Sequence, residues 1–164
     1  MWHEDTDQDK LSRFGEKIVK ELWPGFHNVK EEANATYLDK KGIDGWLNTF
    51  HTHSVNGQQA VQLKTDTVIA ESKNFYKEHY KKTFGTRIPL AAQDWRISPI
   101  YADYHIFVTA YKAYIVTVHA FALAAIGRRL TKINDSSIGV LVPMSEVDIK
   151  EERDHRYSLD PSTW

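Results

Sequence analysis

Four polar residues stand in segments that are otherwise typical of the core of a folded domain. Glu16 lies in an amphipathic stretch, Asp44 near the start of the hydrophobic segment GIDGWL, and Gln62 and Lys64 in the run AVQLK. A hard divalent cation such as Mg²⁺ binds oxygen ligands and keeps several waters, so Asp44 and the amide oxygen of Gln62 suit such a site. A lysine beside the cation can orient water or offset charge that develops on a phosphoryl group. These residue types indicate metal-assisted hydrolysis of a phosphodiester, with water as the nucleophile.

Hydrophobic periodicity predicts the elements that would position these side chains. Residues 9–23 have apolar side chains at helical spacing, and Glu16 falls at the edge of the apolar stripe. Residues 43–50 and 59–65 are each typical of a strand, and the intervening loop contains the turn dipeptide Asn56-Gly57. Because side chains alternate across a strand, Gln62 and Lys64 share one face of the second of these strands.

The rest of the chain predicts a mixed fold in a single domain spanning residues 1–164. In chain order we expect a short strand over 26–32, a basic helix over 67–84, a loop over 85–99, strands over 104–110 and 113–118, a helix over 119–130, an apolar run over 138–142 and a partly ordered, charged tail from about 144. The expected class is α/β or α+β, with a mixed central sheet flanked by helices in the order αβββαββα.

The order FGEKIVKELW, then GIDGWL, then AVQLK resembles the PD-(D/E)XK nuclease superfamily, over residues from about 11 to 118. That resemblance implies a restriction-endonuclease-like fold, as in Holliday-junction resolvases, and Mg²⁺-dependent cleavage of DNA. It implies that Glu16 is the helix glutamate, Asp44 the metal-binding aspartate and Lys64 the strand lysine. Gln62 then occupies a position that is usually acidic in the family, and both Asp44 and Gln62 would bind the metal. An endonuclease is favoured over an exonuclease, and Mn²⁺ is a candidate substitute for Mg²⁺.

Gln62 is the departure from the family pattern. Its amide oxygen can bind a cation, but it brings no negative charge and so holds the cation less strongly than a carboxylate would. Glu71, seven residues beyond Lys64, is one candidate to compensate, and Glu31 and Glu32 are two others.

The segment KNFYKEHYKK, residues 73–82, interleaves lysines with aromatic residues. On the expected helix, Lys73, Lys77 and Lys81 recur at intervals of four and share one side, which suits contact with successive phosphates. A solvated helix face is the alternative interpretation of the same spacing.

Composition excludes some classes of protein and leaves others open. The chain has no cysteine, which excludes disulfide scaffolds and thiolate chemistry. No apolar run is long enough to cross a bilayer, so we expect a cytoplasmic protein with no membrane partner. The net charge of -1 does not itself indicate nucleic-acid binding. Two alternatives stay open: a non-catalytic nucleic-acid-binding protein on a decayed nuclease scaffold, and a protein-interaction domain. A homodimer, and RNA in place of DNA, are also open.

Overall fold

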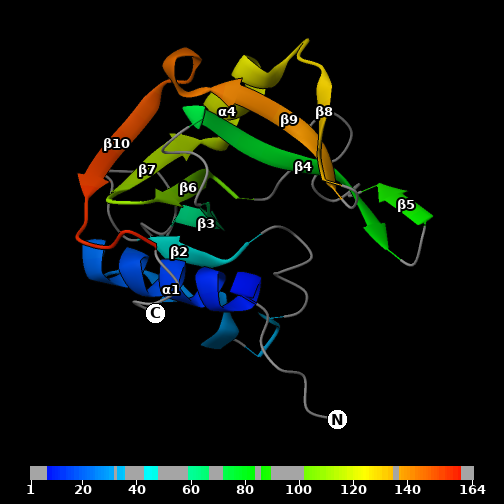
Figure 1. Ribbon diagram of the computed structural model, residues 1–164. Coiled ribbons are helices and arrows are strands. Elements are labelled where there is room, and N and C mark those ends of the chain that lie inside the picture. The colour runs from blue at the N-terminus through cyan, green and yellow to red at the C-terminus, as the bar shows by residue number, and fades with distance from the viewer. Residues whose placement is uncertain are drawn as a thin grey trace.

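A helix and two β-sheets form successive layers of the molecule in a computed structural model (Figure 1). The structure describes residues 7–31, 33–35, 43–47, 59–66, 72–83, 86–89, 102–134 and 137–159. The class is mixed α/β, as expected from the sequence.

The first helix, α1 (Asp7–Leu22), forms where the apolar periodicity predicts it. Its stripe is buried, with Ile18 and Val19 fully shielded from solvent. The ammonium of Lys20 donates to the carbonyl oxygens of Pro24 at 2.8 Å and Phe26 at 2.7 Å, beyond the end of the helix. These bonds hold the chain as it turns from the helix into the first sheet.

The larger sheet has six strands in the order β1-β2-β3-β6-β7-β10. Their bounds are β1 (His27–Asn28), β2 (Gly45–Leu47), β3 (Gln59–Thr65), β6 (Tyr104–Thr109), β7 (Lys112–Thr117) and β10 (Ile149–Asp154). The pairs β2–β3 and β6–β7 are antiparallel, as expected, whereas β3 and β6 run parallel. The expected short strand is confined to β1, which is followed by a 3₁₀ turn, η1 (Val29–Glu31).

The smaller sheet has four strands in the order β5-β4-β9-β8. Their bounds are β4 (Asn74–Thr83), β5 (Thr86–Pro89), β8 (Leu130–Asn134) and β9 (Ser137–Pro143). A second helix, α4 (Val118–Ala125), follows β7 and is capped by Thr117, whose hydroxyl accepts from the Ala120 N–H. It ends well before Leu130, which instead begins β8. A short 3₁₀ turn, η3 (Met144–Glu146), follows β9.

The prediction of a basic helix over 67–84 is wrong for its described part. Lys73 has a positive φ of 57°, which interrupts any helix, and β4 begins at the next residue. β4 pairs with the apolar strand β9 along most of its length, so burial of Phe75 and its neighbours against a sheet overrides the four-residue spacing of the lysines. Lys77 and Lys81 lie in this strand, so no helical face joins them to Lys73.

Two hydrophobic cores cover the two faces of the larger sheet. One lies beneath α1 and includes Phe14, Ile18, Val61 and Ile106. The other lies between the two sheets and α4, where the Phe75 and Phe107 rings stack with centroids 4.3 Å apart. Alternation along β3 therefore directs Val61 to the core beneath α1 and its neighbour Gln62 to the opposite face.

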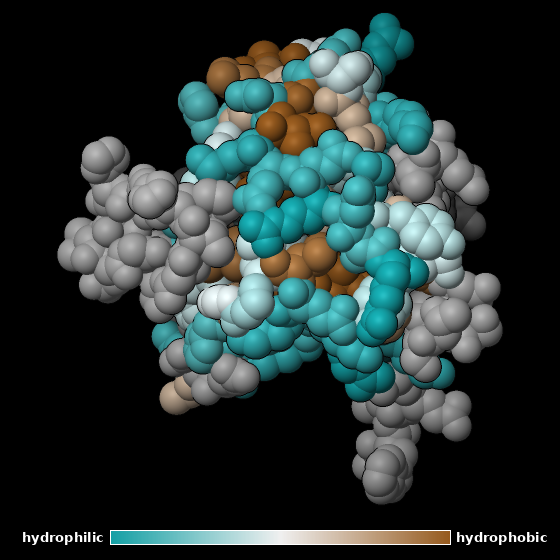
Figure 2. All heavy atoms as spheres, turned by 90° about the vertical axis from the view of Figure 1, so that its left-hand side faces the viewer, coloured by the Kyte–Doolittle hydropathy of each residue, from teal (hydrophilic) through white to brown (hydrophobic). Residues whose placement is uncertain are grey.

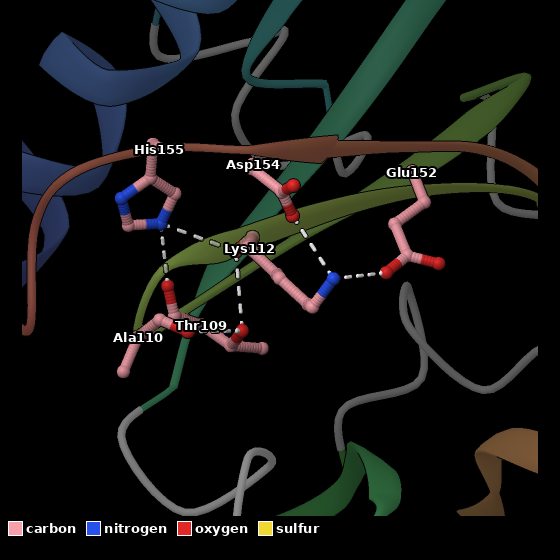
Figure 3. Close-up of polar contacts among 6 residues, drawn as sticks. All are labelled: Thr109, Ala110, Lys112, Glu152, Asp154 and His155. Carbon is pink, nitrogen blue, oxygen red and sulfur yellow. Dashed lines mark hydrogen bonds and ion pairs between the residues drawn. The ribbon is translucent and has the colours of Figure 1, made fainter.

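The charged C-terminal segment is ordered as the edge strand β10, which corrects the prediction of a partly ordered tail. The Lys112 ammonium contacts Glu152 at 2.6 Å and Asp154 at 2.9 Å across the β7–β10 pair (Figure 3). These hydrogen bonds raise the pKa of Lys112 above its usual value. Cross-strand ion pairs let a strand of charged residues occupy the solvent-exposed edge of a sheet.

The other face of β10 is bound to α1. The Arg153 guanidinium lies 4.8 Å from the Trp23 ring centroid and donates to the Leu22 carbonyl oxygen. Figure 2 shows the β10 side of the molecule, where a band of hydrophilic side chains has hydrophobic atoms above and below it. Neither described helix is long and apolar enough to cross a membrane.

Candidate functional site

Three hydrogen bonds hold Asp44 just before β2, two of them to β3. Its N–H donates to the Val61 carbonyl at 2.8 Å, and its carbonyl accepts from the Val29 N–H at 2.9 Å. Its carboxylate oxygen Oδ2 accepts from the Leu63 N–H at 2.7 Å. The side chain thus continues the β2–β3 pairing where backbone pairing by β2 ends, and it is half-buried.

The hydrogen bonds of Asp44 bring its carboxylate beside the part of β3 that holds Gln62 and Lys64. Its Oδ2 atom accepts from the N–H of Leu63, which lies between Gln62 and Lys64 in the chain. Gln62 and Lys64 share one face of β3, because side chains alternate across a strand. Both side chains are half-buried. Three of the four residues singled out in the sequence therefore lie on β3 or directly before the adjoining strand β2.

On the neighbouring strand β6, the residues that pair with Gln62 and Lys64 are buried and aromatic. Gln62 pairs in register with His105, and Lys64 pairs with Phe107. His105 is only 4% exposed, and its ring centroid lies 5.2 Å from that of Phe121. The site therefore has an apolar floor on its β6 side, which lowers the local dielectric and strengthens electrostatic interactions there.

The Lys64 ammonium lies over an aromatic ring that belongs to the second sheet. Its Nζ atom is 5.0 Å from the centroid of Tyr76, the third residue of β4. Tyr76 is 7% exposed. Sequence analysis missed this neighbour because the expected basic helix assigned the segment to a solvent-facing element.

Glu16 lies on α1, which packs against the opposite face of β3 from Gln62 and Lys64, so the structure does not bring it together with those two side chains. Helix and strand approach closely there. A Cβ atom added to Gly15 would lie 1.8 Å from the Thr65 hydroxyl oxygen, so only glycine permits this crossing. Glu16 follows directly, and its carboxylate accepts from the Lys30 ammonium at 2.9 Å. Lys30 adjoins Val29, the residue that bonds to Asp44, so an ion pair and a backbone bond connect Glu16 with Asp44.

Lys30 is a second residue that sequence analysis missed, because only the folded chain brings it to Glu16 from 14 positions away. Of the carboxylates considered as compensation for Gln62, Glu31 lies in η1, and Glu32 and Glu71 lie outside the described residues. Within the described part of the chain, no three His, Asp or Glu side chains are grouped so that they could hold a metal ion.

A second glycine explains how β1 comes so close to Asp44. A Cβ atom on Gly45 would lie 2.5 Å from the His27 carbonyl oxygen and 2.4 Å from the Phe26 ring. Residues 43–45 can therefore pack against the residues that enter β1 only because Gly45 lacks a side chain.

Comparison with known proteins gives no relative from which a function could be transferred: no family model, no curated protein and no solved structure matches this chain.

Proposed function

We propose that this protein is a metal-dependent nuclease that hydrolyses phosphodiester bonds of DNA. The observation that carries the proposal is the hydrogen bond from the Leu63 N–H to the Asp44 carboxylate, which sets that carboxylate beside the part of β3 where Gln62 and Lys64 share one face. A carboxylate, an amide oxygen and an ammonium so arranged are the groups that metal-assisted attack of water on a phosphodiester requires.

The order of elements supports the proposal. A helix leads into three consecutive strands, and the later pair β6 and β7 leads into α4, as in the αβββαββα order that the family resemblance implies. There are two differences. The described residues between β3 and β6 form β4 and β5 in place of a helix, and the strands β8, β9 and β10 follow α4. The residues of the proposed site lie on β3 and directly before β2, with Tyr76 of β4 in contact with Lys64.

The donor atoms fit a hard cation. Asp44 and Gln62 would hold Mg²⁺, or Mn²⁺ as a substitute, through oxygen atoms, with waters completing the coordination. The cation would supply Lewis acidity toward the phosphate and lower the pKa of a bound water. Lys64 would offset the charge that develops on the phosphate. The role expected of Glu16, to position water, the cation or Lys64, stays a prediction from the sequence, because α1 covers the other face of the sheet.

A non-catalytic nucleic-acid-binding protein is the second candidate, and the β4–β5 ribbon favours it. In its antiparallel register Lys82 pairs with Arg87, and the adjoining Lys81 pairs with Ile88. The register therefore sets basic residues on two paired strands, and nucleic-acid phosphates are attracted to such a concentration of positive charge. Figure 1 shows this ribbon extending from the side of the molecule.

Cleavage of labelled DNA separates the candidates. Duplex, single-stranded, flap and four-way-junction substrates would be incubated with Mg²⁺ or Mn²⁺ and the wild type, Asp44→Asn or Lys64→Ala. We expect metal-dependent cleavage that each substitution lowers by about 100-fold or more. Asparagine is chosen at position 44 because its amide oxygen can still accept from the Leu63 N–H while the charge is removed.

Lys112→Ala is the matched control, because it removes a lysine from the far edge of the sheet, where Lys112 contacts β10. Salt-sensitive binding of DNA without cleavage would favour the second candidate. If the protein neither binds nor cleaves DNA, that result would favour a protein-interaction domain. A homodimer stays a prediction, to be checked by light scattering on the same samples.

A further inference from the structure

The contact between Lys64 and Tyr76 joins the proposed site to the second sheet. Lys64 lies on β3 in the six-stranded sheet, and Tyr76 lies on β4 in the four-stranded sheet. The ammonium is 5.0 Å from the ring centroid, within the range at which a cation is attracted to the negative face of an aromatic ring.

The Tyr76 ring belongs to a strand that is itself anchored beside Lys64. Its neighbour Phe75 stacks on Phe107 with 19° between the ring planes. Phe107 is the register partner of Lys64 on the adjoining strand β6. Two consecutive residues of β4 therefore contact two residues that pair across β3 and β6, and this fixes the position of the ring relative to the lysine.

An anchored ring limits the conformations of a flexible side chain. Lysine has four rotatable bonds, and a solvated ammonium samples many positions. A ring that attracts the ammonium before substrate arrives reduces the ordering needed in the transition state, where misplacement of a charge is costly.

From these contacts we infer that Tyr76 is a positioning residue for Lys64, holding the ammonium where it meets the scissile phosphate. This inference rests on the proposed nuclease function. The ring supplies the interaction and the hydroxyl is not required, so phenylalanine can replace tyrosine and leucine cannot.

Steady-state cleavage by three variants tests the inference. Tyr76→Leu is expected to lower kcat about 10-fold with KM little changed, whereas Tyr76→Phe keeps near wild-type activity. Tyr104→Leu is the matched control, because Tyr104 is also buried, at 5% exposed, but belongs to the core beneath α1, on the other face of the sheet from Lys64. It is expected to lower stability without changing kcat at a temperature where all the variants are folded.

A second readout does not depend on activity. In the wild type, the ring current of Tyr76 is expected to shift the NMR signals of the Lys64 ε-methylene protons. This shift should disappear in Tyr76→Leu and persist in Tyr76→Phe and Tyr104→Leu. Wild-type kcat in Tyr76→Leu, an equal loss in Tyr76→Phe, or an equal loss in Tyr104→Leu would each overturn the inference while the nuclease function stands. A wild-type protein that cleaves no substrate would overturn both.

Discussion

Asp44 shows that one side chain can serve the fold and a proposed reaction together. Its carboxylate accepts the Leu63 N–H at 2.7 Å, in a partly buried position where an unsatisfied donor is costly. Asp103 does the same for the Ala60 N–H at 3.0 Å, but that bond is exposed to solvent. β3 thus receives a side-chain acceptor from an aspartate on either side, and only the first lies in the proposed site.

These two bonds predict different costs for removing the acceptor. Asp44→Ala is expected to lower the free energy of unfolding by about 1–3 kcal/mol, because the Leu63 N–H loses its partner away from water. Asp44→Asn keeps an acceptor and should lose less, while Asp103→Ala should cost less than Asp44→Ala because water can replace the lost oxygen. Urea unfolding of the three variants measures this, and equal losses for Asp44→Ala and Asp103→Ala would contradict the structural role of Asp44.

At the scale of elements, the sequence predicts the helices and strands whose formation depends on residues close together in the chain. The stripe of α1 and the strand β3 end within two residues of the expected positions, because each has a clear period and a turn signal beside it. β4 and β10 were missed because their charged residues carry no such signal. β4 depends on pairing with the apolar strand β9. β10 depends on the ion pairs with Lys112 and on the contacts of Arg153 with the end of α1.

The candidate site likewise has residues that the sequence predicts and partners that it does not. Asp44, Gln62 and Lys64 lie close together in the chain, and antiparallel pairing of β2 with β3, which the sequence predicts, brings Asp44 to the part of β3 that holds the other two. The partners of the charged groups, Lys30 and Tyr76, are set by how α1 and β4 pack on the sheet. No spacing along the chain encodes those distances.

The crossing of α1 over β3 depends on Gly15. Alanine favours a helix over glycine by about 1 kcal/mol, yet the added Cβ would lie 1.8 Å from the Thr65 hydroxyl oxygen. Gly15→Ala should therefore lower the free energy of unfolding by about 1–3 kcal/mol, as overpacked cores do, and should disturb Glu16.

Thermal denaturation with a double-mutant cycle checks the cause. In Gly15→Ala/Thr65→Ala part of the clash is removed, so the double variant should lose less stability than the sum of the two single losses. Ser12→Ala on the exposed side of the same helix is the control for helix propensity. An additive double variant would show that Thr65 is not the obstacle.

At the scale of the whole molecule, the two faces of the larger sheet respond differently to solvent conditions. Beneath α1 the core is apolar, and its stability should vary little with pH. On the other face, burial, followed by the charge of Glu152, raises the pKa of Tyr114 above its ordinary value of 10.0. Hydrogen bonds to Glu152 and Asp154 raise the pKa of Lys112 above 10.5 in the same region. Two groups that lose a proton at high pH are therefore coupled to the β7–β10 edge.

Both pKa values are raised on folding, which sets the sign of the pH dependence. The stabilisation from each group is fully present below its pKa in the unfolded chain and is lost as the pH rises through its pKa in the folded state. The free energy of unfolding should therefore fall as the pH rises above about 10, measured by urea unfolding from pH 8 upward. Tyr114→Phe removes one of the two protons and should flatten this fall, and Lys112→Met should do so independently, with the loss of its ion pairs visible at pH 8. If the free energy of unfolding falls as steeply in both variants as in the wild type, other groups cause the alkaline sensitivity. In that case the β7–β10 edge does not set the pH dependence of the sheet that carries the proposed site.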